Sequence, residues 1–385
     1  MTPQIAYPGV YIQEIPSRIK RIRPVKTSIA VVVGSFVKGL INVAKRVKTW
    51  KECIQIFVGL NKKHLASYSI KQFFDNGGTT PWIVRTEPKN SATAPALIQG
   101  LRALANVQFL NILFIPETHR VESRAASKVH REAITIAEQH HAMYILDPPF
   151  QGVNSTTAST MASWVSRQKT LRHSQVVIYA PRVRVHYPRH AKQTILIPAS
   201  GAIAGLWARI DNTQGVWKTP AGTEATLRNV QSLKQRMTTQ DIEDLTNTGI
   251  NALRLLPSNQ IVPWGARTLS TDPEWKYIPV RRLALMIESN LLRGTQWVVF
   301  EPNDEPLWAS TRQSVGNFLN GLFRKGAFQG ARPEEDYFVR CGPDTMSMND
   351  QQIGTVNIMI GFAPMKPAEF VILTIQQQAQ VLGSS

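Results

Sequence analysis

The stretch DPEWKYIPVRRLALMIESNLLRGTQWVVFEPNDEPLW, residues 272–308, is the most individual part of this 385-residue chain. It carries three tryptophans and an arginine pair, and it leads through a glycine-bearing helix into residues 337–341. Within it, residues 277–290 predict a mixture of strand and amphipathic helix, and residues 297–300 predict a strand. The apolar run at residues 370–375 follows and has no obvious partner within its own chain. Together these features favour a subunit that joins others over an enzyme.

The segment that follows the opening stretch predicts a helix with two different faces. Its apolar residues recur at helical spacing and form one stripe: Leu307, Trp308, Thr311, Val315, Phe318, Leu319 and Leu322. Its other face is polar: Arg312, Gln313, Gly316, Asn317, Asn320 and Arg324, with Lys325 at the end. Two interior glycines, Gly316 and Gly321, each cost a helix about 1 kcal/mol relative to alanine. They indicate either close approach by another surface or simple packing, and the sequence leaves these alternatives even.

The C-terminal segments predict two strands. Residues 355–362 alternate apolar and polar side chains, as a half-buried antiparallel strand does. Residues 369–375 are apolar on both faces and would be an aggregation hazard as an open edge. This strand either pairs within its own chain or is donated to the sheet of a neighbour. The amide-rich tail at residues 376–385 predicts no fixed structure.

The N-terminal part predicts an arm and then a smaller folded segment. Residues 1–20 form the arm, whose β-prone run is closed by Pro16. Residues 21–94 contain two expected strands and a helix, and we expect this segment to pack with the C-terminal domain. Residues 87–95 resemble a linker. A β-prone arm at each end of the chain makes reciprocal strand donation between copies attractive.

The middle of the chain alternates strands and helices. Short apolar runs predict strands at residues 110–115, 143–146, 176–179 and 194–197, with helices at 122–140 and 158–171. This rhythm indicates a mostly parallel sheet covered by helices. The expected fold is therefore a central α/β domain at residues 95–270, a C-terminal α+β assembly domain at 271–365, and extended arms at 1–20 and 366–385.

A parallel sheet invites a search for an active site at its strand ends. Asp147, His173, His186 and Ser200 could be ordered as an acid, bases and a nucleophile. However, Ser200 is interpreted more simply as a helix N-cap, and Asp147 before two prolines is ordinary turn chemistry. No Gly-x-Ser-x-Gly elbow is present. A hydrolase therefore stays only an alternative.

The sequence predicts no cofactor and no metal. The pair His140-His141 has only Glu138 near it at ligand spacing. The chain lacks a nucleotide-binding glycine motif, because no Gly-Lys-Ser/Thr follows Gly77-Gly78. The loop at residues 211–223 carries Trp217, which we expect to tether the loop to its own core.

The net charge of +18 indicates an acidic partner. The basic residues are spread out, with dense clusters only at residues 18–26 and 182–192, and no nucleic-acid-binding motif accompanies them. Binding to DNA or RNA is therefore the second alternative, and it is disfavoured. No signal peptide and no membrane-spanning run are expected. Cys53 and Cys341 are expected to be reduced thiols.

Taken in order, the motifs of this chain resemble the sheath subunit of contractile phage tails and of extracellular contractile injection systems. The pieces that carry the resemblance span most of the chain: residues 7–11, 73–82, 215–220, 249–254, 264–268, 272–277, 293–308 and 363–375. The compact length is more similar to injection-system sheaths than to the larger sheaths of myophages. The basic residues 182–192 have no counterpart in the family pattern.

The resemblance implies a fold, partners and residue roles. It implies that the central domain is subtilisin-like but not catalytic, and that subunits polymerise helically around an inner tube, with baseplate and terminal cap proteins as further partners. It implies synthesis in the bacterial cytoplasm and action in an extracellular particle. Strands of the two arms would pair with neighbouring subunits, through Val10, Tyr11, Ile12, Ile15, Val371, Ile372, Leu373 and Ile375. A C-terminal-domain helix would face the tube, through Arg312, Gln313, Asn317, Asn320, Arg324 and Lys325.

Overall fold

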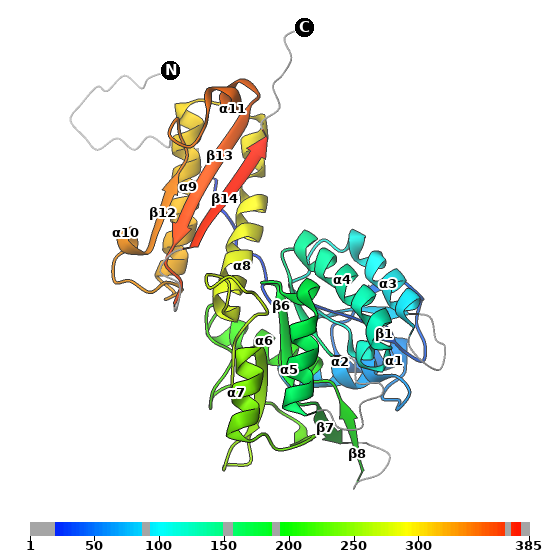
Figure 1. Ribbon diagram of the computed structural model, residues 1–385. Coiled ribbons are helices and arrows are strands. Elements are labelled where there is room, and N and C mark those ends of the chain that lie inside the picture. The colour runs from blue at the N-terminus through cyan, green and yellow to red at the C-terminus, as the bar shows by residue number, and fades with distance from the viewer. Residues whose placement is uncertain (1–19, 87–92, 149–156, 187–192, 366–370, 379–385) are drawn as a thin grey trace, which may run out of the picture.

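The computed structural model describes residues 20–86, 93–148, 157–186, 193–365 and 371–378. Two lobes of unequal size are joined by one long helix, α8 (Ile278–Gly294) (Figure 1). The larger lobe holds an eight-stranded sheet, and the smaller lobe holds a three-stranded sheet with helices.

The large sheet has the strand order β11-β10-β6-β5-β4-β1-β3-β2. Its inner pairs are parallel, and only the edge pairs β10–β11 and β2–β3 are antiparallel. The strands are β1 (Ala30–Ser35), β2 (Ala44–Arg46), β3 (Trp82–Thr86), β4 (Ile112–Phe114), β5 (Met143–Leu146), β6 (Val176–Ala180), β10 (Ile250–Leu255) and β11 (Ile261–Pro263). Because β1, β4, β5 and β6 are buried throughout, they carry apolar residues on both faces, as parallel strands between two helical layers do.

Helices cover both faces of this sheet. One hydrophobic core lies under α1 (Trp50–Phe57), α2 (Leu65–Asp75) and α6 (Ser200–Thr213). The second core lies under α3 (Ala94–Arg102), α4 (Ser123–Gln139), α5 (Ala158–Arg167) and α7 (Thr239–Asn247). Short 3₁₀ turns connect elements at Ala103–Asn106 (η1), Pro116–Arg120 (η2) and Lys169–Leu171 (η3). The lobe is therefore a three-layer α/β/α sandwich.

Helices α2 and α6 cross closely because glycine lines the crossing. A Cβ on Gly201 would lie 2.1 Å from the carbonyl oxygen of Ser69, and a Cβ on Gly205 would lie 2.3 Å from that of Phe73. Only glycine permits this backbone approach. The crossing fixes the start of α6 beside the ends of the central strands.

A small antiparallel sheet lies beside the sandwich, in the order β8-β7-β9. It contains β7 (Val183–His186), β8 (Thr194–Ile197) and β9 (Val230–Leu233). The strand predicted at residues 194–197 therefore exists, but its placement in the parallel sheet is wrong, because it pairs antiparallel with β7. Of the basic cluster at 182–192, residues 187–192 lie outside the described part.

The smaller lobe is a three-stranded antiparallel sheet, β12-β13-β14, packed on α8 and α9 (Glu305–Phe323). Its strands are β12 (Tyr337–Arg340), β13 (Thr355–Phe362) and β14 (Val371–Gln378). The remaining elements are η4 (Gln296–Phe300), α10 (Pro333–Asp336) and α11 (Met348–Gln352). The sheet of this lobe includes β14, which the sequence placed in a separate arm at 366–385 and not in the domain expected at 271–365.

The strand predicted at residues 297–300 is wrong. These residues form the 3₁₀ turn η4, in which the Val298 amide donates to the Thr295 carbonyl, 2.9 Å away. Val298 is fully buried in the core of the smaller lobe directly after α8 ends. Residues 278–290 are helical throughout, so the strand component predicted there is also absent.

The predicted grouping of residues 21–94 with the C-terminal domain is wrong for most of the segment. Strands β1 and β3 lie inside the large sheet, with β1 between β3 and β4. Only the start of the segment runs along α8, where the Val25 amide donates to Asn290 Oδ1 at 2.7 Å and Ile22 lies against Gly294. Long-range strand pairing, which leaves no local signal in sequence, decided this arrangement.

Candidate functional site

The helix predicted to face a tube is α9, and its two faces differ as expected. It begins at the N-cap Asp304, whose Oδ1 accepts a hydrogen bond from the Leu307 amide at 3.1 Å. Its stripe of apolar residues is buried in the core of the smaller lobe. On the other face Gln313, Asn317, Arg324 and Lys325 are exposed, and Arg312 and Asn320 are partly exposed.

Two of the six predicted contact residues are engaged within the chain. Arg312 donates from Nη1 to the Cys341 carbonyl and from Nη2 to Glu305 Oε1. Asn320 hydrogen-bonds the Tyr337 hydroxyl. The charge of Arg312 is therefore already paired, and among the described residues no ion pair engages the other two cations of this face, Arg324 and Lys325.

Within the described part of the chain, no atom packs against the two glycines of α9. A Cβ on Gly316 or on Gly321 would meet no atom within 4 Å. Of the two alternatives for these residues, internal packing is excluded by this open space. Bare helix backbone is thus presented on the outer face of the lobe.

The C-terminal strand adopts the first of its two predicted alternatives. Strand β14 pairs antiparallel with β13 of its own chain, from Thr355 opposite Gln378 to Phe362 opposite Val371. Residues Val371, Ile372, Leu373 and Ile375 are thus all in the paired strand. The N-terminal residues Val10, Tyr11, Ile12 and Ile15 lie outside the described residues.

The structure brings together two of the four residues considered for catalysis. Ser200 Oγ donates a hydrogen bond to Asp147 Oδ2 at the carboxyl ends of the central strands. His173 lies elsewhere, with Nε2 2.8 Å from Glu138 Oε1, and His186 ends β7 with an exposed side chain. Ser200 and Asp147 are both buried, at 1% and 4% exposure. Neither His173 nor His186 bonds to Ser200, and the described residues pair a different serine and histidine, with His64 Nδ1 3.0 Å from Ser35 Oγ.

The two simpler interpretations of this pair also need correction. The N-cap position of α6 is occupied by Ala199, and Ser200 is the first helical residue. Asp147 accepts hydrogen bonds from both the hydroxyl and the backbone amide of Ser200. Asp147 therefore takes the capping role that the sequence assigned to Ser200.

Burial dominates the electrostatics around this pair. Desolvation raises the pKa of Asp147 from 3.8 to about 8, with the Ser200 hydrogen bonds opposing. The pKa of the buried Glu117 is raised for the same reason, against hydrogen bonds from the Ala66 amide and the Ser35 hydroxyl. Burial lowers the pKa of His119 to about 3, so this ring is neutral. Asp147, Glu117 and His119 are therefore buried groups of the protein interior.

Sequence reasoning missed an ion pair that joins the two lobes. Arg282 of α8 donates from Nη1 and Nη2 to the two carboxylate oxygens of Asp211, at 2.8 and 2.7 Å. Thr27 Oγ1 donates to Asp211 Oδ2 at 2.8 Å, and Arg282 stacks 4.7 Å from the Trp207 ring. The pair is almost completely buried, with side-chain exposures of 3% and 1%. The Arg281-Arg282 dipeptide was the sequence feature that could have indicated this pair. However, Asp211, the partner of Arg282, lies 71 residues away in the sequence.

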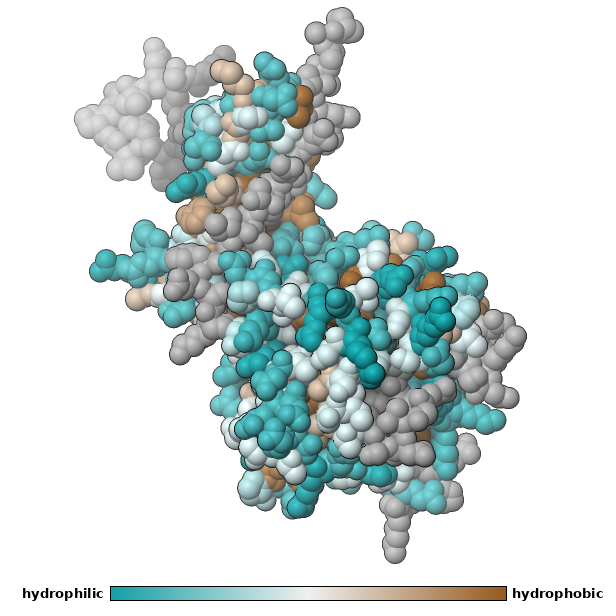
Figure 2. All heavy atoms as spheres, in the orientation of Figure 1, coloured by the Kyte–Doolittle hydropathy of each residue, from teal (hydrophilic) through white to brown (hydrophobic). Residues whose placement is uncertain are grey.

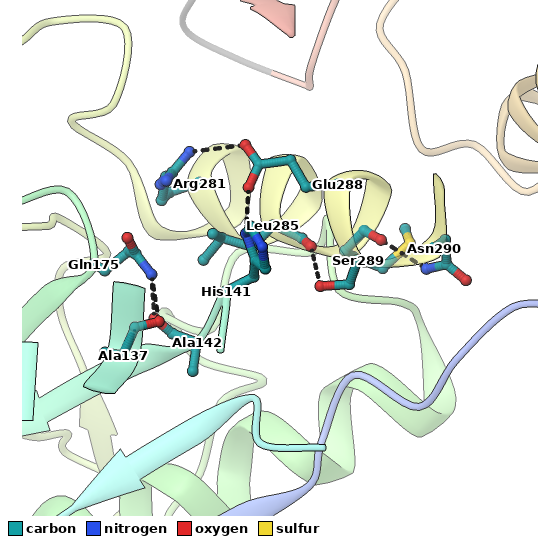
Figure 3. Close-up of polar contacts among 10 residues, drawn as sticks. Ala137, His141, Ala142, Gln175, Arg281, Leu285, Glu288, Ser289 and Asn290 are labelled. Carbon is teal, nitrogen blue, oxygen red and sulfur yellow. Dashed lines mark hydrogen bonds and ion pairs between the residues drawn. The ribbon is translucent and has the colours of Figure 1, made fainter. Parts of the chain in front are cut away.

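A second polar contact fixes α8 on the large lobe. Glu288 accepts from His141 Nδ1 at 3.1 Å and lies 3.5 Å from Arg281 Nη1 (Figure 3). His141 follows α4 and Glu288 lies about half a turn past the middle of α8, so the contact spans two elements. Helix α8 also belongs to two cores, because Ile278 and Leu285 pack with the large lobe while Leu283 and Ile287 pack with the smaller lobe. Helix α8 is thus tied to both lobes by side-chain contacts.

The loop at residues 211–223 contacts the smaller lobe. Val216 is buried in that lobe's core, and Trp217 packs against it. Trp217 therefore tethers the loop to a core of its own chain, as expected, and that core is the one of the smaller lobe. The loop reinforces the connection made by α8.

The described residues hold no cluster of three potential metal ligands. Among them, no helix is long and apolar enough to cross a membrane. Cys53 and Cys341 are free and buried, and burial raises the pKa of both thiols to about 12.

Two family models, both of the phage tail sheath, match consecutive parts of the chain, which lie in both lobes. The central domain of the phage tail sheath protein matches residues 90–269, and the phage tail sheath C-terminal domain matches residues 270–378. The chain belongs to the phage tail sheath family. The family boundary falls at the start of the segment that leads into α8.

Solved structures match the sheath protein over nearly its whole length. The contracted helical sheath of the anti-feeding prophage is 28% identical, with a TM-score of 0.76, and covers 97% of this chain and 100% of its own. The contracted PVC sheath, from an extracellular contractile injection system, is 25% identical, with a TM-score of 0.76 and 99% coverage of both chains. The mixed α/β fold with a mostly parallel central sheet is therefore confirmed.

Curated relatives are larger. A prophage protein of Pseudomonas aeruginosa strain UCBPP-PA14, named as a major tail sheath protein, is 26% identical over 61% of this chain and 57% of its own length. The tail sheath protein of Enterobacteria phage T4 is 25% identical over 60% of this chain and 37% of its own. The sheath protein thus spans from about a third to just over half of the length of these relatives.

Proposed function

We propose that this sheath protein polymerises helically around an inner tube and contracts to drive the tube through a target envelope. The observation that carries the proposal is the end-to-end match to two sheaths solved in the contracted state. The buried Ser200–Asp147 pair supports a structural role for a central domain that is subtilisin-like in layout. Baseplate and terminal cap proteins would be the other partners, within a particle made in the bacterial cytoplasm and acting outside the cell.

The predicted arm exchange is compatible with the pairing of β14. A neighbour's β14 could occupy the same edge of β13 in the same antiparallel register, because a swapped strand makes the contacts that the chain makes with itself. The N-terminal arm, with Val10, Tyr11, Ile12 and Ile15, would act in the same way. Each subunit would then be linked to its neighbours while its two lobes move as one body.

The polar face of α9 would contact the tube. Gln313, Asn317, Arg324 and Lys325 are exposed there, beside helix backbone left open by Gly316 and Gly321. Arg312 and Asn320 would act from partly exposed positions at the border. An acidic tube surface would attract Arg324 and Lys325.

Expression with the tube protein, followed by negative-stain electron microscopy, tests the proposal. We expect striated sheaths around tubes, or wide hollow cylinders from the sheath protein alone. Persistent monomers under both conditions would contradict it.

Deletion of residues 369–385 tests strand exchange. We expect folded, soluble subunits that no longer polymerise, because β13 loses the strand that links copies. Deletion of residues 379–385 alone is the matched control, since it leaves β14 intact. Normal polymers from the longer deletion would rule out the exchange, with circular dichroism checking the fold of both variants.

A further inference from the structure

Two exposed apolar patches of opposite charge lie on different lobes of the sheath protein. Ten large apolar side chains are markedly exposed among the described residues, and eight of them fall into these two groups. The first group, the basic patch, consists of Val37, Leu40, Ile41, Val43, Ile54 and Val58. The second, the acidic patch, consists of Met348 and Ile353 with the neighbouring Asp344 and Asp350.

The basic patch is formed by the loop between β1 and β2 together with the end of α1. Leu40 is 72% exposed, and the other five apolar side chains are 40–46% exposed. Residues 36–64 carry seven lysines and arginines and a single acid, Glu52. Because β2 is a three-residue edge strand with exposed Lys45 and Arg46, it resists strand addition, so a partner would bind through side chains.

The loop holds its apolar side chains outward by specific contacts. Arg85 donates through its guanidinium to the carbonyls of Phe36, Val37 and Gly39, and the Lys38 amide donates to the Phe57 carbonyl at 3.4 Å. The Phe36 and Phe57 rings pack beneath, with centroids 5.0 Å apart. The exposure of the patch is therefore a property of an ordered loop.

Val58 adds an independent sign of function. It ends α1 with a φ of 64°, in the left-handed region, which is strained for a β-branched residue. Glycine would relieve the strain at this position, yet valine is present and 45% exposed. Strain of this kind concentrates where a surface is used.

The acidic patch surrounds α11 at the tip of the smaller lobe. Met348 is the most exposed large apolar residue described, at 84%, and Ile353 is 49% exposed. Residues 341–365 contain two acids and no lysine or arginine. Figure 2 shows brown surface set among teal at this tip, where Figure 1 places α11.

The same segregation of charge runs through the whole chain. Residues 1–294 carry 38 lysines and arginines against 17 acids, whereas residues 295–365 carry 5 against 8. Two basic patches facing each other would repel, which excludes a symmetric pairing. An acidic apolar surface of matching character is available on every other copy.

We propose that the basic patch of one sheath subunit binds the acidic patch of another. The two patches lie on separate lobes joined by α8 and do not meet within the chain as it is folded (Figure 1). A contact between two different surfaces is heterologous and repeats from copy to copy, producing rings or helical polymers. The inference rests on the proposed polymerisation and names two surfaces that carry it.

Cysteine cross-linking tests this contact directly. Leu40→Cys and Met348→Cys subunits are purified separately, mixed with tube protein under polymerising conditions and treated with a short bismaleimide. We expect a band at about twice the 43.1 kDa monomer mass from the mixture. The native thiols of Cys53 and Cys341 should stay silent, because both are buried.

Met365→Cys is the matched control for Met348→Cys. Met365 is a methionine of the same lobe, 48% exposed and outside both patches. Its mixture with Leu40→Cys should give no cross-linked band. Equal cross-linking of both mixtures, or cross-linking of Leu40→Cys only with itself, would overturn the proposal.

Substitution gives the functional readout. Leu40→Ser and Met348→Ser should each raise the critical concentration for polymerisation about tenfold, while Met365→Ser leaves it unchanged. Polymers that form normally in both patch variants, without the cross-link, would overturn the inference and leave the proposed function standing. If the unmodified protein forms no polymers, both the proposed function and this inference are contradicted. Loss of binding to anionic vesicles in Leu40→Ser, with polymers unchanged, would assign the basic patch to a lipid surface instead.

Discussion

Asp147 shows how burial can turn a carboxyl group into a pH-dependent element of stability. Its pKa is raised from 3.8 in the unfolded chain to about 8 in the folded protein, because burial disfavours the charged form. The folded state therefore binds the proton more tightly. The stabilising effect is complete below pH 3.8 and is lost as the pH rises towards 8.

Asp147→Asn should remove this dependence. The amide oxygen can still accept the Ser200 hydrogen bonds, and no charge develops as the pH rises. We expect the variant to gain stability relative to the unmodified protein by about 1 kcal/mol per pH unit between pH 5 and 8. Thermal melts across this range measure the gain, with the exposed Glu243→Gln as control. A difference that does not change with pH would show that Asp147 is ionised in the folded protein.

At the scale of single elements, α9 is marked by its two unsupported glycines. Gly316→Ala and Gly321→Ala should each stabilise the subunit by about 1 kcal/mol, because alanine favours the helix and the added methyl meets no atom of the chain. The same methyl would obstruct a tube that approaches the backbone. We therefore expect a higher melting temperature together with weaker assembly on the tube.

Glu243→Ala is the control for these variants, since it changes an exposed position of another helix, α7, outside the proposed tube-contacting face. Melting temperature and pelleting with tubes are the two measurements. Stabilised variants that assemble normally would show that the tube does not approach α9 at these glycines.

Helices and strands with a clear hydrophobic periodicity were predictable from the sequence, but the elements that pack or pair with them were not. The apolar stripe of α9 and the alternation in β13 placed both elements correctly. The same periodicity could not show that β8 joins the small sheet, or that β1 lies between β3 and β4, because pairing depends on residues far away in the chain. Residues 297–300 misled because a short apolar run fits a strand or a buried turn equally well.

For the candidate contact residues, exposure was likewise predictable from the sequence, whereas their partners within the chain were not. The exposed positions of Gln313, Asn317, Arg324 and Lys325 come directly from helical spacing. The pairing of Arg312 with Glu305 and the Cys341 carbonyl needed the folded lobe. The Arg282–Asp211 pair could not be predicted either, because its two residues are 71 positions apart in the sequence.

At the scale of the whole molecule, the sharing of α8 between two cores predicts cooperative unfolding. Leu285 packs in a core of the large lobe and Leu283 in that of the smaller lobe, although both are on one helix. Leu285→Ala and Leu283→Ala should each cost about 3 kcal/mol and lower one common transition. Differential scanning calorimetry should give a single peak for each protein. Two separated peaks, with only one moved by each substitution, would show that the lobes unfold independently.

The uneven distribution of charge also bears on how quickly a sheath can grow. A subunit with excess positive charge on residues 1–294 and excess negative charge on residues 295–365 has a large electric dipole moment. In the field of a growing end, such a subunit rotates towards the head-to-tail orientation before it touches. Orientation before contact raises the association rate and reduces the number of misdirected encounters, most strongly at low ionic strength. The same charges that distinguish the two lobes would therefore set the direction and the speed of sheath growth.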